Sequence, residues 1–144
     1  MSGTRSTTEL LLQSKLYRPR IPGHFVKRKR LLEKLDQGSQ RRLTLVSAPA
    51  GYGKTTLVNS WLETLDEANA WLSLDESDNS FEIFVAYLAT AVRRQYPAAV
   101  SNTWSLVNSP GLPEPPRLAD IFLQELEALP GRLFLVLDDY HACL

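Results

Sequence analysis

Two glycines, a lysine and two threonines stand close together in the first half of this 144-residue chain. They belong to the stretch Ala48-Pro49-Ala50-Gly51-Tyr52-Gly53-Lys54-Thr55-Thr56. Backbone N–H groups of such a loop, and of the first helical turn after it, have no helical partner and can together bind an anion. Glycine also allows a phosphate to approach the backbone closely. The residue types and their spacing therefore predict a phosphate-binding P-loop.

The polar side chains of this loop have separate expected roles. Lys54 is expected to bring a positive charge to the β- and γ-phosphates of a nucleotide, and the hydroxyl of Thr55 is expected to bind Mg²⁺. Ala48 departs from the general pattern, which begins with glycine. A Gly-Lys-Thr triplet also occurs in ordinary turns with a surface lysine, so the interpretation depends on the flanking elements.

The flanking elements are expected in the order that a P-loop requires. The apolar, β-branched run Leu43–Ser47 predicts a buried strand before the loop. Apolar residues recur at helical spacing after it and predict a helix; they are Leu57, Val58, Trp61, Leu62 and Leu65.

A second candidate site lies near the C-terminus. The five apolar residues Leu133–Leu137 predict a strand buried on both faces, as in a parallel sheet. Asp138 and Asp139 follow it, and ligands of open α/β sheets bind outside the carboxyl ends of the strands. Asp138 is therefore expected to hold Mg²⁺, directly or through water, and Asp139 to polarise an attacking water. The alternative is a strand that ends in an ordinary acidic turn, and His141 beside it is equally consistent with a packing role.

The rest of the chain predicts an N-terminal extended segment, residues 1–24, and a nucleotide-binding domain, residues 25–144. Leucines in the extended segment require a surface to pack on. The further expected elements are a helix around Leu31–Leu35 that stops at Gly38, a strand at Ala70–Leu74, a helix from an Asn79 N-cap to Tyr96, a loop or lid at Ala98–Pro116 and a helix at Leu118–Leu129.

Composition limits the remaining possibilities. The formal net charge is +0, and the cluster Lys27–Arg30 has no interleaved aromatic residues, so a solvated helix start is favoured over a nucleic-acid patch. The single cysteine, Cys143, excludes a disulfide framework and fits a cytoplasmic protein. No apolar run reaches the length of a membrane span.

Several stretches, taken in order, resemble the N-terminal part of the MalT-like transcriptional activators of the LuxR group, which belong to the STAND class of P-loop ATPases. The stretches are Leu12–Pro19, Val26–Leu32, Leu43–Leu57, Ala70–Asn79 and Leu135–His141. The resemblance implies that Ala48 begins the family's own variant of the loop, that Val26 and Arg28 line the adenine pocket, and that the cofactors are ATP and Mg²⁺. It also implies an α/β three-layer P-loop NTPase fold with a parallel sheet, of which about three core strands are present.

By the same resemblance, the strand Leu133–Leu137 with Asp138 is the Walker B strand, and the chain is an ATP-binding switch module that is truncated after it. Self-association is then expected only in the full-length protein, and DNA binding only through a C-terminal domain that this sequence lacks. A strand at Leu43–Ser47 without its neighbours predicts an unstable or aggregation-prone chain. The alternatives are a small P-loop kinase or other phosphotransferase, and an inert remnant of a truncated gene.

Overall fold

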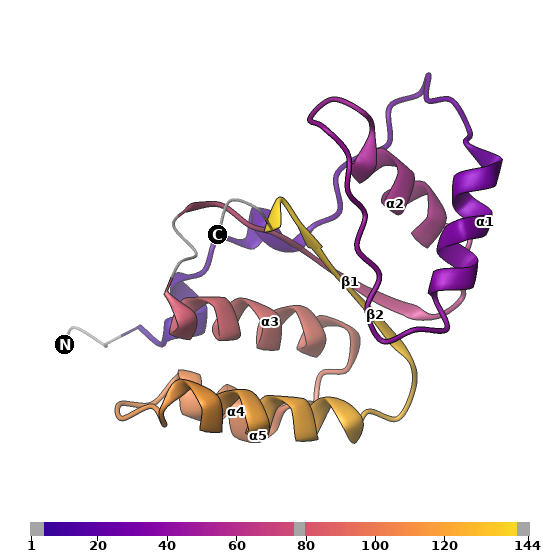
Figure 1. Cartoon of the computed structure of the whole chain (residues 1–144). Helices are drawn as coiled ribbons and strands as arrows, with labels where there is room; N and C mark the ends of the chain where they lie inside the picture. The colour runs from indigo at the N-terminus through magenta and orange to yellow at the C-terminus, as the bar shows by residue number, and fades with distance from the viewer. Residues whose placement is uncertain (1–4, 77–79, 141–144) are drawn as a thin grey trace. The chain divides into compact units, whose positions relative to one another are not determined.

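The computed structural model describes residues 5–76 and 80–140, so the predicted roles of Asn79, His141 and Cys143 lie outside the described residues. The chain forms two compact units (Figure 1). Unit 1 comprises residues 1–17 and 67–144, and unit 2 comprises residues 18–66. In the sequence, unit 2 is therefore one continuous segment, which the two segments of unit 1 precede and follow.

Unit 1 contains a parallel two-stranded sheet, which confirms the α/β class. Strands β1 (Ala68–Ser73) and β2 (Leu133–Asp138) pair in register, with Ser73 opposite Asp138. The middle of β1 is buried, but all six residues of β2 are only half-buried. The expectation that β2 is buried on both faces was wrong, because β1 is its one paired neighbour among the described residues.

Three helices complete the core of unit 1: α3 (Phe81–Gln95), α4 (Ser101–Val107) and α5 (Pro115–Glu127). Helix α3 packs against β1 and lies between the sheet and the pair formed by α4 and α5 (Figure 1). One apolar cluster joins these layers, and its most deeply buried members include Leu72, Val92, Val107 and Leu118. These helices follow the predicted apolar spacing except for α4.

Helix α4 corrects the prediction of a loop or lid at Ala98–Pro116. The carboxylate of Glu125 on α5 accepts hydrogen bonds from the backbone N–H groups of Asn102 and Thr103, at 2.8 and 2.9 Å, and from Thr103 Oγ1 at 2.6 Å. A seven-residue helix is too short to be stable by propensity alone. Its cap comes from a residue 22 positions further along the chain, so a local sequence pattern does not reveal it.

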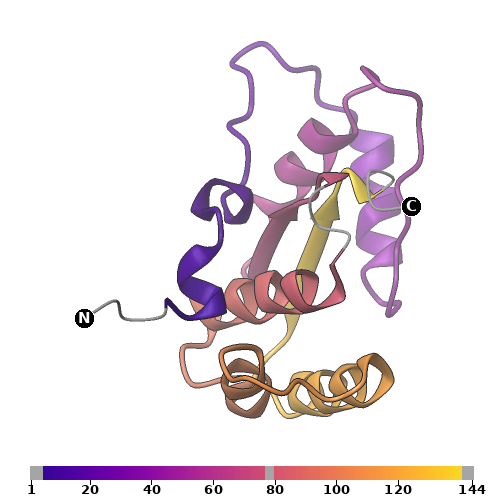
Figure 2. The same cartoon turned by 90° about the vertical axis from the view of Figure 1, so that its left-hand side faces the viewer.

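Residues 5–17 form a strap on unit 1. The strap contains two 3₁₀ helices, η1 (Thr7–Leu10) and η2 (Gln13–Leu16); η2 contacts β1, and η1 contacts α3 (Figure 2). Leu11 and Leu16 are buried in the apolar cluster of unit 1, as the expected packing of the leucines requires. The extended course predicted for this segment is thus interrupted by two short helical turns.

Unit 2 consists of helices α1 (Lys29–Gly38) and α2 (Lys54–Leu62) and the segments that precede them. The two helices contact each other, and Trp61 Nε1 donates a hydrogen bond to Asp36 Oδ1 at 2.7 Å. Both helices agree with the sequence pattern, including the stop of α1 at Gly38. In the described part of the chain, no helix is long and apolar enough to cross a membrane.

The predicted strand at Leu43–Ser47 was wrong. This stretch has no strand pairing, and Leu43 and Leu45 are 83% and 82% exposed. A β-branched, apolar run forms a strand only when a neighbouring strand pairs with its backbone and its side chains are buried. Unit 2 contains no strand that could do this among its residues.

Candidate functional site

The loop between the exposed Leu43–Ser47 stretch and α2 contains a tight turn. The N–H of Tyr52 donates a hydrogen bond to the carbonyl of Pro49 at 3.3 Å, which closes the turn. Gly51, the third residue of the turn, has φ of 85°, a value that favours glycine at this position of a type II turn. Pro49, Ala50 and Tyr52 are exposed on the surface of this turn.

Gly53 connects the turn to α2. It is the N-cap residue of the helix, has φ of 78° and accepts the first helical hydrogen bond, from the N–H of Leu57 at 2.9 Å. A Cβ atom built on Gly51 or Gly53 would meet no other atom within 4 Å. The glycines are therefore required by the backbone conformation, and the space beside them is open to a ligand.

Lys54 is the first residue of α2, and its ammonium group turns back to the loop. Its Nζ atom donates a hydrogen bond to the carbonyl oxygen of Ala48. A carbonyl oxygen is the same type of partner as a phosphate oxygen, but it carries no full charge. An anion in the loop would therefore compete for the ammonium group and gain a charge-assisted hydrogen bond.

Thr55 and Thr56 complete the first turn of α2, and both are half-buried. The N–H groups of this turn have no carbonyl partner one turn earlier in the helix, and the positive end of the helix dipole lies here. The loop Ala48–Thr56 thus combines open glycines, one ammonium group, oriented N–H groups and a hydroxyl. This set fits the phosphates of a nucleotide, and the hydroxyl oxygen of Thr55 is of the type that a hard divalent cation prefers.

Val26 and Arg28, the residues expected to line the adenine pocket, also belong to unit 2. Val26 is 82% exposed, and the side chain of Arg28 is exposed as well. The carbonyl of Arg28 accepts hydrogen bonds from Leu31 and Leu32, both at 3.0 Å, at the start of α1. The adenine pocket stays a prediction.

Asp138 and Asp139 lie in unit 1 at the carboxyl end of β2, where the sequence placed them. Asp138 is the last residue of the strand; its carbonyl accepts the N–H of Leu74, and its Oδ1 accepts the N–H of Asp139, both at 3.0 Å. Asp139 has φ of 56°, a left-handed conformation that aspartate tolerates better than most residues. The turn fixes the Asp138 carboxylate beside its own backbone and leaves Asp139 exposed.

Across the described ranges, no group of three or more His, Cys, Asp and Glu side chains is arranged to hold a metal ion by itself. In a P-loop protein, Mg²⁺ is held by one hydroxyl and one carboxylate, together with waters and phosphate oxygens.

Asn59 on α2 is a polar residue that the sequence pattern did not identify. It is 3% exposed, its amide nitrogen donates to the carbonyl of Pro19, and its Oδ1 has no hydrogen-bond partner. The amide fixes the segment before α1 onto α2. Asn59 and Ser60 are both polar and stand together between Val58 and Trp61, so the sequence pattern does not show which of them is buried.

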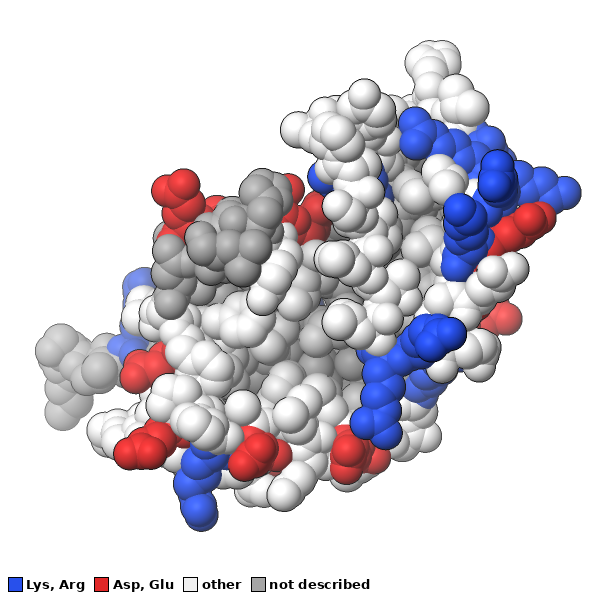
Figure 3. Space-filling model, in the orientation of Figure 1, with Lys and Arg blue, Asp and Glu red and all other residues white. Residues whose placement is uncertain are grey.

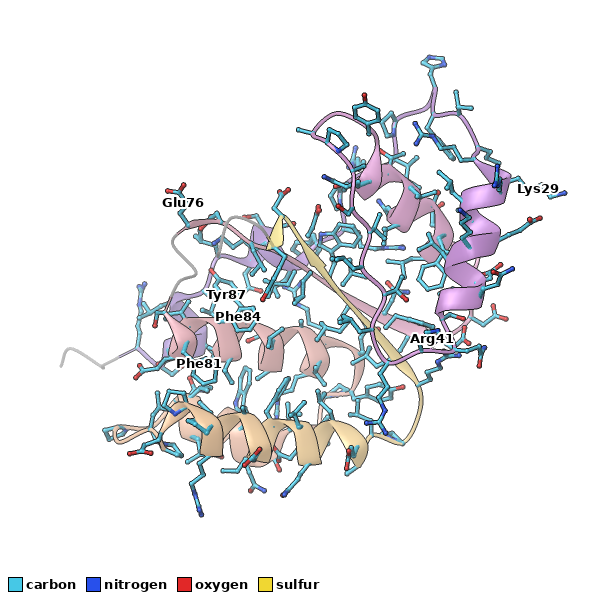
Figure 4. The ribbon with its side chains drawn as sticks, in the orientation of Figure 1. Lys29, Arg41, Glu76, Phe81, Phe84 and Tyr87 are labelled. Atoms are coloured by element: carbon cyan, nitrogen blue, oxygen red, sulfur yellow. The ribbon has the colours of Figure 1, made fainter. Side chains whose placement is uncertain are left out.

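An ion pair between the buried Lys15 and the exposed Asp75 anchors the strap at the carboxyl end of β1. Lys15 is 8% exposed, and its Nζ lies 2.8 Å from Asp75 Oδ2 and 5.2 Å from the ring centre of Tyr87. The hydroxyl of Tyr87 accepts the N–H of Leu12 at 3.0 Å. Figure 4 shows Tyr87 on α3, from which its side chain extends toward the strap.

Unit 1 also has an open pocket of ≈ 440 Å³ between the end of α3 and the end of α5. Its lining includes Tyr96, Val100, Glu125 and Leu129, and it contains none of the predicted site residues. The polar group of Glu125 is already used to cap α4. The pocket is therefore not a candidate for the nucleotide site.

Comparison with known proteins agrees with the loop geometry. The AAA ATPase domain family matches residues 27–143 of the chain. The HTH-type transcriptional regulator MalT of Cronobacter sakazakii (strain ATCC BAA-894) is 42% identical over 135 residues, and that of Yersinia pestis (strain Pestoides F) is 41% identical over 133 residues. Each alignment covers 92% of this chain, but the chain spans only 14% of the length of these relatives.

Proposed function

Since the chain belongs to the AAA ATPase domain family, we propose that it is an ATP-binding switch module of a MalT-like transcriptional regulator. The family implies nucleotide binding with a metal ion; the choice of ATP and Mg²⁺ is part of the proposal. The proposal also includes self-association and DNA binding as properties of a longer regulator. This regulator is proposed to be cytoplasmic.

In this proposal, the residues of the loop bind the phosphates. The backbone from Ala48 to Gly53 and the N–H groups of Lys54, Thr55 and Thr56 would hold the phosphates. Lys54 leaves the carbonyl of Ala48 and donates to the β- and γ-phosphates, where it offsets their negative charge. Val26 and Arg28 contact the adenine ring.

The two carboxylates act on the metal and the water. Thr55 and Asp138 would hold Mg²⁺, which supplies charge neutralisation at the phosphates. The carboxylate of Asp139 would orient the attacking water by accepting a hydrogen bond from it. Binding of ATP, rather than its turnover, defines the switch state.

The observation that carries this proposal is the arrangement of Gly51, Gly53 and Lys54. Two glycines at positive φ and an ammonium group that bonds to the carbonyl of the same loop lie at the N-terminus of a helix, which supports an anion site there. An ordinary surface turn with a solvated lysine, the alternative to a P-loop, does not predict that contact.

The test is ATP binding by the purified chain, measured with a fluorescent ATP analogue and competition by unlabelled ATP. Affinity is expected to be higher with Mg²⁺ than with EDTA. Thr55→Ala is expected to remove this Mg²⁺ dependence, while the matched variant Thr55→Ser, which keeps the hydroxyl, retains it. A folded chain, verified by circular dichroism, that binds no nucleotide would exclude the proposal for this chain.

A further inference from the structure

The formal net charge of the chain is zero because the positive net charge of unit 2 is equal and opposite to the negative net charge of unit 1. Unit 2 contains ten Lys and Arg residues and four Asp and Glu residues, a formal net charge of +6. Unit 1 contains six Lys and Arg residues and twelve Asp and Glu residues, a formal net charge of −6. A segment of 49 residues with this excess creates a strong positive potential around itself.

The positive side chains of unit 2 are directed to solvent. Nine of the ten are exposed; the exception is Lys54, which is half-buried in the loop. None of the nine makes an ion pair in the described part of the chain, where the two ion pairs, Lys15–Asp75 and Arg132–Glu67, belong to unit 1. The nine residues are Arg18, Arg20, Lys27, Arg28, Lys29, Arg30, Lys34, Arg41 and Arg42.

Six of these residues form what we name the basic surface: Lys27, Lys29, Arg30, Lys34, Arg41 and Arg42. Figure 3 shows Lys and Arg side chains gathered over α1 and over the segment that follows it. Lys29 and Arg41 lie near opposite ends of α1, and both side chains point outward (Figure 4). A ten-residue helix is about 15 Å long, so the basic surface extends over at least that distance.

The opposite side of α1 explains why the cations lie outside. Leu35 is 8% exposed and Trp61 is 6% exposed where α1 contacts α2, and the bond from Trp61 to Asp36 fixes the rotation of α1 about its axis. The apolar residues of α1 are thus used inside unit 2. Because an interfacial membrane helix needs an exposed apolar face, α1 does not have the character of a membrane-binding helix.

The sequence alone favoured a solvated helix start for Lys27–Arg30, but Arg41 and Arg42 extend this cluster into a larger surface. We propose that the basic surface binds the phosphate backbone of duplex DNA without reading its sequence. Duplex DNA presents one negative charge per about 1.7 Å of helix axis, which gives several phosphates along a surface of this length. Arg and Lys are the side chains that contact phosphates, and such contacts position a protein without specifying bases. The proposal extends the proposed function, because a regulator that already binds a promoter elsewhere gains affinity from a second, sequence-independent contact.

The composition of the basic surface favours a duplex over single-stranded nucleic acid. Single strands are bound by stacking of bases on exposed aromatic side chains between cations. The stretch from Lys27 to Arg42 contains no aromatic residue. Backbone contacts without stacking are what a duplex offers to such a surface.

The test uses the purified 144-residue chain and a fluorescein-labelled duplex of random sequence, about 20 base pairs long, with anisotropy measured from 50 to 300 mM KCl. Non-specific binding through phosphates gives dissociation constants of about 10⁻⁴–10⁻⁶ M at physiological salt and a steep loss of affinity with added salt. Six phosphate contacts predict a slope of log K against log salt of about −5.

Two matched variants locate the contact. Arg41→Gln/Arg42→Gln removes two positive charges from the basic surface and is expected to weaken binding on the order of tenfold or more and to reduce the slope by about 2. Arg5→Gln/Arg117→Gln removes two exposed charges from unit 1 and is expected to leave binding unchanged. Equal effects of the two variants would overturn the proposal, as would no binding of DNA at 50 mM KCl.

Other polyanions distinguish the partner. Poly-glutamate and vesicles of phosphatidylcholine with 30% phosphatidylserine are titrated under the same conditions; binding of either with the affinity of duplex DNA would overturn the assignment to DNA. Lys54→Ala, which is expected to lose ATP, should retain DNA binding. DNA binding without ATP binding, or the reverse, therefore shows which of the two proposals fails.

Discussion

The Nζ atom of Lys54 donates a hydrogen bond to the carbonyl oxygen of Ala48, six residues earlier in the same loop. The contact closes the loop on itself and keeps the ammonium group partly buried. In the proposed function, nucleotide binding would exchange this carbonyl acceptor for a phosphate oxygen rather than order a solvated side chain.

Lys54→Met is expected to weaken ATP binding by about 10- to 150-fold, because a hydrogen bond to a charged group contributes about 1.5–3 kcal/mol. The variant keeps the length and apolar stem of the side chain, so α2 should remain folded. The measurement is competition against a fluorescent ATP analogue. Lys34→Met, on the exposed side of α1, is the matched control and should bind ATP as the unmodified chain does. Equal ATP affinity of Lys54→Met and Lys34→Met would contradict the role of Lys54.

Asp138→Asn is expected to bind ATP normally in EDTA and to lose the increase in affinity that Mg²⁺ gives, because an amide oxygen is a weaker ligand for a hard cation than a carboxylate. Asp139→Asn should keep the Mg²⁺ effect, since asparagine also tolerates the left-handed backbone found at this position. Titration of ATP affinity with Mg²⁺ measures both. Asp120→Asn, exposed on α5, controls for the loss of one negative charge. An undiminished Mg²⁺ effect in Asp138→Asn would assign the metal to other groups.

The ion pair between Lys15 and Asp75 predicts an asymmetry in stability. The Lys15 side chain is 9% exposed, whereas that of Asp75 is 54% exposed. Asp75→Asn removes a carboxylate that lies 2.8 Å from the buried ammonium group of Lys15 and is expected to lower the free energy of unfolding by about 1–3 kcal/mol. Lys15→Met leaves a carboxylate that water can solvate and keeps the apolar stem, so a loss below about 1 kcal/mol is expected.

Urea unfolding followed by circular dichroism measures both changes. Glu76→Gln, an exposed position beside Asp75, is the control and should have no effect. A larger loss for Lys15→Met than for Asp75→Asn would show that the ion pair itself, rather than the burial of Lys15, determines the stability.

The cap of α4 predicts a large effect at one of two glutamates on α5. Glu125→Ala removes the acceptor of three hydrogen bonds and leaves two backbone N–H groups at the start of a short helix without a partner. A loss of about 2–3 kcal/mol in the free energy of unfolding is expected. Glu127→Ala, two residues away and exposed, should change it by less than about 0.5 kcal/mol. Similar stabilities of the two variants would mean that α4 does not depend on its cap.

The sequence predicts the elements whose information is local. The loop from Ala48 to Thr56 and the start of α2 follow from glycine positions and apolar spacing, and β1, β2, α3 and α5 follow from runs of apolar residues. Asp138 could be placed at the carboxyl end of β2 because the strand before it is continuous.

The sequence does not predict an element or a contact when the residue that stabilises it is distant in the chain. Leu43–Ser47 has the pattern of a strand, but a strand needs a paired neighbour, and the pattern of one segment does not contain it. Helix α4 depends on Glu125 from another helix. Asn59, Lys15 and Asp75 were not identified because each of them acts through a residue from another element, and a single sequence shows no such contact.

The positions that the strap contacts determine the order in which the chain can fold. Leu12 bonds to Tyr87 and Thr8 bonds to Asn108, so these contacts close loops of 75 and 100 residues. During synthesis the strap is made first, yet its binding surface exists only after α3 and α4 have been made. The contact of Asp36 with Trp61 closes only 25 residues, so unit 2 can form while the strap still has no surface to bind. We therefore expect docking of the strap to follow the formation of α3 and α4 in the folding of this chain.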